Sequence, residues 1–416
     1  MAVAAAVVVA GSVGGVASSS AKTARAAAGS TVDWYSSLPL SGSTIAQTGP
    51  TVKGIKLALK QANYKAGSYT INYTSLNDAT AAAGAWTAEA TSAAAHKAAA
   101  DSKAVYYIGE FNSGASEVSM PILNEAGIAQ DSPANTYVGL TASLHGVTAP
   151  GEPQKYFPTG KRTYTRIVPA DNVQGASDLL AFKQLGCKRL AVFDDTQAYG
   201  AGLAAVLKAT AKQYGITVLP IQSDAQVQPN YTSVAQKFAS EGAQCVELSA
   251  TTATVGGTAF VSAIHAALPH AKILGPDGMC ASAWATTVPV LCTVATLNMQ
   301  SYPGGRSFLR AYKAAYGTSN PDPYSIYGYA SAQLGLAALK TVKAGLSGKA
   351  LRAAMVKAMF SLRHANTVLG KMGIDPAGDT TLTSYGLYKL TPTKNGKSDN
   401  QTFYKVLAPT KYLHVS

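Results

Sequence analysis

Short apolar runs alternate with longer alanine-rich stretches from Val32 onward, as strands alternate with helices in an α/β protein. In the first half of the chain, the apolar runs predict strands over residues 32–36, 70–75, 104–108 and 127–129. The stretches between them predict helices over residues 50–62, 84–100 and 116–125. This alternation is typical of a mainly parallel sheet with helices on both faces.

A second cycle of the same kind begins after Arg166. It predicts helices over residues 172–185, 200–214, 233–241 and 258–267, and strands over residues 190–193, 217–221, 245–248 and 272–274. Three more helices are predicted over residues 305–316, 324–343 and 347–360. A β-rich tail over residues 384–412 contains a turn at Lys394-Asn395-Gly396. We therefore expect two doubly wound, Rossmann-like α/β lobes.

Small polar turns follow the predicted strands. They comprise residues 36–42, 110–114 and 132–136 in the first lobe and residues 194–200, 249–252 and 276–278 in the second. Ligands of open parallel sheets bind outside the carboxyl ends of the strands. Two such edges that face each other across a cleft would surround one small molecule.

Residues 1–26 are predicted to be a secretion signal. The apolar run over residues 3–16 is diluted by Ala, Gly and Ser, which argues against a permanent membrane span. Ala24-Arg25-Ala26 has the A-x-A form of a signal-peptidase site. A disordered alanine-rich leader is the alternative interpretation.

Charge argues against a nucleic-acid partner. The chain has 416 residues, 34 Lys and Arg against 21 Asp and Glu, and a formal net charge of +13. The basic residues are spread singly, with nothing denser than the pairs at residues 161–162 and 188–189. Such a distribution is typical of a solvated surface rather than of a nucleic-acid track.

The chain has four cysteines, Cys187, Cys245, Cys280 and Cys292. An even number in an exported chain predicts two disulfides. Cys187 precedes one predicted strand and Cys245 opens another, so both would lie at the N-terminal edge of neighbouring parallel strands. We therefore pair Cys187 with Cys245, and Cys280 with Cys292. A zinc site is disfavoured because no C-x-x-C motif occurs and the six histidines lack i,i+4 spacing.

Catalytic motifs are absent from the sequence. It contains neither G-x-S-x-G nor G-x-x-x-x-G-K-[ST], and the glycines of Gly200-Ala201-Gly202 lack the third glycine of a dinucleotide fingerprint. Asp194 and Asp195 could form an acid pair, but adjacent side chains that leave a strand diverge. We therefore expect a protein without enzymatic activity, cofactor or metal.

Six segments in the same order resemble the type I periplasmic binding proteins, in particular the leucine/isoleucine/valine-binding group that serves ABC importers. They read LPLSG, YYIGEFNSGAS, PILNEAGIAQDSPANT, TRIVPADNVQG, RLAVFDDTQAYGAGLA and ILGPDGM. The resemblance implies a Venus-flytrap fold whose chain crosses the hinge three times, near residues 161–168, 297–304 and 384–388. The N-terminal lobe would comprise residues 31–164 and 304–383, and the C-terminal lobe residues 165–303 and 384–416.

The resemblance also implies a ligand site between the lobes, formed by Ser113, Ala134, Thr136, Tyr199, Thr251 and Asp277. The first three match the family's site for an α-carboxylate, Tyr199 matches an aromatic wall, and Asp277 stands where the family has a glutamate for the α-ammonium. Thr251 replaces a second tyrosine, and Glu110-Phe111-Asn112 replaces a more neutral turn, so side-chain specificity does not carry over. The alternative interpretation makes these residues helix caps, turn residues and core.

Function follows as an expectation from the resemblance. It implies a monomeric solute receptor, outside the cytoplasm, that binds an amino acid or a similar small polar molecule and presents it to an ABC permease. No cysteine precedes Cys187, so no lipoprotein anchor is predicted. The alternatives are a ligand-sensing module of the same fold that signals to a separate partner and, less favoured, a hydrolase that uses the cleft.

Overall fold

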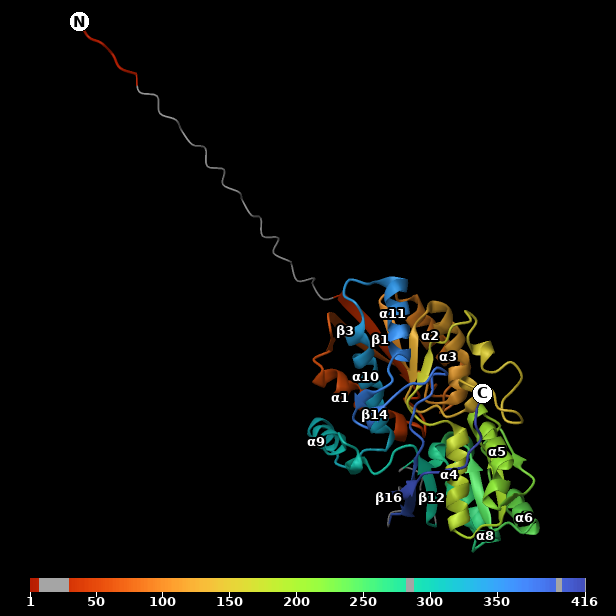
Figure 1. Ribbon diagram of the computed structural model, residues 1–416. Coiled ribbons are helices and arrows are strands. Elements are labelled where there is room, and N and C mark those ends of the chain that lie inside the picture. Colours follow the sequence, from red (N-terminus) through yellow and green to blue (C-terminus); the bar gives the residue numbers. More distant parts are fainter. Residues whose placement is uncertain (7–29, 282–287, 394–398, 416) are drawn as a thin grey trace.

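The computed structural model describes residues 1–6, 30–281, 288–393 and 399–415. Most of the expected secretion signal, residues 7–26, and the expected turn at Lys394-Asn395-Gly396 lie outside the described residues. Two sheets with their helices occupy separate halves of the molecule (Figure 1). Within the described ranges, no helix has both the length and the apolar character that a membrane crossing needs.

The first sheet has the strand order β2-β3-β1-β4-β5-β6, in which only β2 runs antiparallel to its neighbour. Its strands are β1 (Ser30–Leu38), β2 (Lys65–Ala66), β3 (Tyr69–Asn77), β4 (Ala104–Ile108), β5 (Ala129–Ser132) and β6 (Tyr164–Arg166). The helices of this half are α1 (Ile45–Gln61), α2 (Ala88–Ala100), α3 (Ser113–Ala126), α9 (Gly305–Tyr316), α10 (Tyr324–Thr341) and α11 (Gly348–Phe360).

Both faces of this sheet are covered, which explains why its strands are apolar at consecutive positions. The rings of Trp34 and Tyr106 meet edge to face under α1 and α10, with centroids 4.7 Å apart. The next residues along these strands, Tyr35 and Tyr107, face α2 and α3 on the opposite side. The sheet is therefore doubly wound.

The second sheet has the strand order β16-β15-β12-β11-β10-β7-β8, and β9 also pairs with β7. Its strands are β7 (Arg189–Asp194), β8 (Thr217–Val218), β9 (Gln222–Ser223), β10 (Cys245–Ser249), β11 (Lys272–Gly275), β12 (Val290–Val294), β15 (Tyr385–Pro392) and β16 (Asp399–Leu407). Its helices are α4 (Asp171–Gln184), α5 (Ala198–Thr210), α6 (Thr232–Ser240), α7 (Thr252–Val255) and α8 (Thr258–Ala267). The expected β-rich tail is the antiparallel pair β15 and β16.

The chain passes between the two halves three times. It leaves β6 for α4, returns from β12 to α9 and α10, both of which contact α1, and leaves the hairpin of β13 (Ala365–Thr367) and β14 (Gly370–Met372) for β15. This confirms the expected α/β fold of two lobes joined by three crossovers. The residue bounds assigned to each lobe remain a prediction.

Several predicted elements have other bounds in the structure; the helix expected over residues 50–62, for example, begins at Ile45, and the strand expected over residues 127–129 is Ala129–Ser132. The strand expected over residues 217–221 ends at Val218, before Pro220, because proline has no N–H for the ladder, and β9 follows separately at Gln222–Ser223. The helix expected to begin at residue 84 begins at Ala88, because the Thr87 hydroxyl accepts the N–H of Ala90 (3.2 Å) and caps it there. Trp86 is thereby left in the preceding turn.

Both disulfides form in the predicted pairs. Cys187 and Cys245 join the N-terminal edges of β7 and β10, with Cα atoms 6.1 Å apart. Cys280 and Cys292 join the segment after β11 to β12, with Cα atoms 5.3 Å apart. None of the described cysteines is free.

Candidate functional site

A small cavity lies where the carboxyl ends of both sheets meet. The lining residues come from both lobes and are Ala85, Trp86, Phe111, Asn112, Ser113, Gly114, Ala134, Thr136, Gln197, Tyr199, Thr251, Ala253, Thr254, Asp277 and Gly278. All six residues expected at the ligand site are therefore brought together.

The first lobe offers hydrogen-bond donors at the start of α3. The N-cap residue Asn112 makes no side-chain cap, and its carbonyl oxygen accepts the N–H groups of Ala115 and Ser116. The N–H groups of the first two helical residues, Ser113 and Gly114, have no partner within the helix, so they suit an anion. The Ser113 hydroxyl accepts the N–H of Tyr137 (3.3 Å), which leaves its own proton for a ligand.

The backbone N–H of Ala134 is not available to a ligand as the resemblance implied. Its N–H donates to the Ser132 hydroxyl oxygen (3.1 Å) and is thus already used. The groups of this lobe that can still donate a hydrogen bond into the cavity are then the N–H groups at the start of α3 and the hydroxyls of Ser113 and Thr136. Glu110 lies outside the cavity lining, fully buried, where it accepts the Tyr107 hydroxyl proton (2.8 Å).

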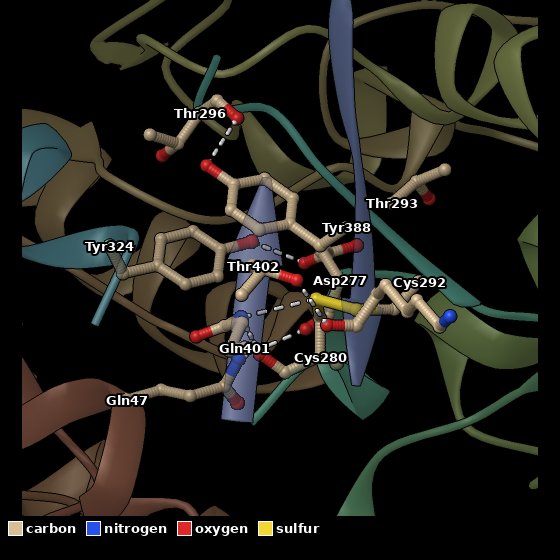
Figure 2. The surroundings of a disulfide bond; sticks show 12 residues. Gln47, Asp277, Cys280, Cys292, Thr293, Thr296, Tyr324, Tyr388, Gln401 and Thr402 are labelled. Atoms are coloured by element: carbon tan, nitrogen blue, oxygen red, sulfur yellow. Dashed lines mark hydrogen bonds between the residues drawn. A yellow bond between two sulfur atoms is a disulfide. The ribbon is translucent and has the colours of Figure 1, made fainter. Parts of the chain in front are cut away.

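The second lobe supplies Asp277, whose side chain connects both lobes. Its Oδ1 accepts the hydroxyl proton of Tyr199 (2.6 Å) from the same lobe, and its Oδ2 accepts that of Tyr324 from α10 of the first lobe. The Gln47 side-chain amide of α1 donates to the Asp277 carbonyl oxygen (2.9 Å). Figure 2 shows Tyr324 and Gln47 approaching Asp277. In this structure the lobes are thus closed on one another at Asp277.

Thr251 lies at the start of the short helix α7. Its N–H donates to Asp195 Oδ2 (3.3 Å), and the Thr254 hydroxyl donates to the same oxygen (2.6 Å). Asp194 instead accepts the Ser223 hydroxyl proton (2.7 Å), so the two neighbouring carboxylates have separate partners, as expected of adjacent strand residues. A threonine here leaves space that a tyrosine ring would fill.

Burial controls the electrostatics of the cavity. It raises the pKa of Asp277, and the hydrogen bonds from Tyr199 and Tyr324 only partly offset this. The ion pairs of the described residues are Lys155–Glu152, Arg166–Asp379 and Lys237–Glu241, all outside the cavity lining. A cation near Asp277 would have to come from a ligand. Nowhere in the described ranges do three or more potential ligand side chains gather to hold a metal.

Buried carboxyls predict higher stability at mildly acidic pH. Burial raises the pKa of Asp171 to about 8, of Asp131 and Asp322 to about 7, and of Asp195 to about 6. Each group binds a proton more tightly in the folded state, so the free energy of unfolding falls as pH rises through these values. Calorimetry should give a melting temperature at least about 3 °C higher at pH 5 than at pH 8. A lower melting temperature at pH 5 would contradict the prediction, and Asp171→Asn should flatten the profile.

Several lining residues were not anticipated from the sequence. Trp86 was hidden in a helix predicted to start too early, and its ring packs on Gly114, where a Cβ would lie 2.8 Å from the indole. Ala253 and Thr254 lie in α7, just beyond the expected turn at residues 249–252, whereas Gln197 falls within the expected turn at residues 194–200. The position of each at the carboxyl end of a strand was the available signal.

Comparison with known proteins identifies the family. A sequence model described as periplasmic binding protein matches residues 36–397. An amino acid binding protein of Pseudomonas aeruginosa is 25% identical over 296 residues, covering 69% of this chain and 72% of that protein. A leucine-binding protein from Thermotoga maritima has a TM-score of 0.71 at 21% identity, covering 91% of this chain and 99% of the other. A solute-binding protein of an ABC transporter from R. palustris, solved with 4-hydroxybenzoate, has a TM-score of 0.73 at 15% identity, covering 92% and 98%. The chain belongs to the periplasmic binding protein family.

Proposed function

We propose that this protein is an extracytoplasmic solute receptor of an ABC importer that closes its two lobes on a small carboxylic acid, in the first place an amino acid. The observation that carries the proposal is the polarity of the cavity. Groups that can donate hydrogen bonds to an anion lie on one lobe, at Ser113, Gly114 and Thr136, and the carboxylate of Asp277 lies on the other. An α-amino acid has the complementary pair of charges and would connect the lobes.

Closure of the two lobes would link ligand binding to transport. A ligand that contacts both lobes binds the closed form better than the open one, and only such a difference in affinity shifts the equilibrium. The closed receptor would then present its ligand to a membrane permease. Among the relatives, the P. aeruginosa protein named for amino acid binding and the T. maritima protein named for leucine support this ligand class.

An aromatic carboxylic acid is the second candidate ligand. The rings of Trp86, Phe111 and Tyr199 line the cavity, and the Phe111 ring meets that of Tyr324 edge to face at 5.0 Å. Such a lining suits a flat ring, because aromatic pairs favour edge contacts and offset stacking. The 4-hydroxybenzoate bound to the R. palustris protein is a molecule of this kind.

A thermal-shift screen tests the proposed function. The purified mature chain would be heated with L-amino acids, with benzoate and 4-hydroxybenzoate, and with sugars as the comparison set. A ligand at 100 times its dissociation constant should stabilise the folded state by about 2.7 kcal/mol. A shift with an amino acid supports the first candidate, and a shift with aromatic acids alone supports the second. A shift with sugars alone would contradict both.

A further inference from the structure

The carboxylate of Asp277 is carried by a very short segment. Strand β11 ends at Gly275, the 3₁₀ turn η4 (Asp277–Met279) follows, and Cys280 comes next. Two backbone hydrogen bonds hold the turn, from the Met279 N–H to the Pro276 carbonyl (2.9 Å) and from the Cys280 N–H to the Asp277 carbonyl (3.1 Å). One turn of this kind has little stability of its own, so external contacts must fix the position of Asp277.

Both ends of this turn are fixed to the same place in the sheet. Gly275 is the ladder partner of Cys292 on the neighbouring strand β12. Cys280, five residues later, returns to form its disulfide with that same Cys292. Asp277 therefore lies near the middle of a small loop, residues 275–280, whose start is held by sheet hydrogen bonds and whose end is held by a covalent bond.

A third contact comes from the last strand. The side-chain amide of Gln401 on β16 donates to the Cys280 carbonyl oxygen (2.8 Å) and lies 3.3 Å from its sulfur. Figure 2 shows Gln401 beside the disulfide, with Asp277 and Tyr324 close by. Both cysteine side chains are fully buried. The disulfide is thus packed directly behind the carboxylate that lines the cavity.

We propose that the Cys280–Cys292 disulfide positions Asp277 for ligand binding, so that ligand affinity depends on this bond and not only on the fold. The inference rests on the proposed function, because it concerns the same cavity. Binding is strongest when the recognising groups are held in place before the ligand arrives. Without the bond, the loop can adopt conformations in which the Asp277 carboxylate does not face the cavity. A smaller fraction of the molecules can then bind ligand, which lowers the apparent affinity.

The other disulfide provides a matched control in the same lobe. Cys245 opens β10 and Cys187 precedes β7, so this bond lies at the N-terminal edge of the sheet. The cavity lies at the opposite, carboxyl edge, about 13 Å away along β10. Its removal should lower stability without moving Asp277. The two bonds therefore separate a role in the site from a role in the fold.

The experiment compares Cys280→Ser/Cys292→Ser with Cys187→Ser/Cys245→Ser, both titrated by calorimetry at a temperature where both are folded. The probes are L-leucine and 4-hydroxybenzoate. For the probe that binds the parent chain, we expect the first variant to lose about 10-fold or more in affinity and the second less than about 2-fold. Parent-like affinity in the first variant, or equal losses in both, would overturn the inference.

Hydrogen exchange gives a readout that needs no ligand. Amides of residues 277–281 should exchange at least about 10-fold faster in Cys280→Ser/Cys292→Ser than in the parent, and at the parent rate in the control variant. If the parent binds neither probe, the proposed ligand class fails, while the exchange rates still decide the role of the bond. Gln401→Ala removes only the third contact, so it should weaken probe binding by about 3-fold. This variant tests the inference even if Cys280→Ser/Cys292→Ser does not fold. Unchanged exchange in residues 277–281 would overturn the inference.

Discussion

Asp277→Asn is expected to weaken the binding of an α-amino acid by about 30- to 1000-fold. The substitution keeps the size of the side chain and removes its charge. The ligand ammonium would then lie in a cavity whose lining has no other acidic group, a loss of about 2–4 kcal/mol. Calorimetric titration of the parent and the variant with L-leucine measures the difference.

Two comparisons make this prediction specific. Thr136→Val deletes one hydroxyl donor beside the open N–H groups of α3, so it should cost only about 1–2 kcal/mol. Binding of 4-hydroxybenzoate, which has no ammonium, should change by less than about 3-fold in Asp277→Asn. If L-leucine binds the variant as tightly as the parent, Asp277 serves only as the acceptor for its two tyrosines, and the amino acid assignment fails.

The fold could be predicted from the sequence because strands that are buried on both faces of a sheet appear as continuous apolar runs. The run that contains Tyr106 and Tyr107 is apolar at consecutive positions, and β4 begins and ends where it was predicted. Helices α8 and α9 also have their predicted bounds. The failures were local. Pro220 shortened one predicted strand. The Thr87 cap moved the start of one predicted helix to Ala88, so Trp86 was not predicted to line the cavity.

The site was less predictable, because its decisive contacts are long-range. The resemblance predicted six site residues, and all six line the cavity. It gave no indication of Tyr324, whose hydroxyl reaches Asp277 from the other lobe, or of Gln47, which lies 230 positions away in the chain. Neither residue has a local signal in the sequence, since each acquires its partner only when the two lobes meet. Such contacts follow from the closed arrangement of the whole chain.

Arg166 connects the first crossover to the segment that precedes the third. Its guanidinium is fully buried, and its Nε pairs with Asp379 Oδ1 at 2.7 Å. The other two nitrogens donate to the Tyr137 carbonyl (2.6 Å) and the Thr141 hydroxyl (2.6 Å). These two acceptors follow Thr136 in the chain, so Arg166 also supports the loop that carries a cavity hydroxyl.

Arg166→Met is therefore expected to lower the free energy of unfolding by about 3–5 kcal/mol. Methionine retains much of the side-chain volume, but it leaves the Asp379 carboxylate without its counter-charge and the Tyr137 carbonyl without its donor. Urea denaturation of the parent, Arg166→Met, Asp379→Asn and the double variant gives the coupling between the two side chains, expected to exceed about 1.5 kcal/mol. A loss below about 1 kcal/mol in Arg166→Met would contradict this role. Because the Thr136 loop would shift with the lost donor, the variant should also bind its ligand more weakly, whereas a purely electrostatic role in stability would leave the affinity unchanged.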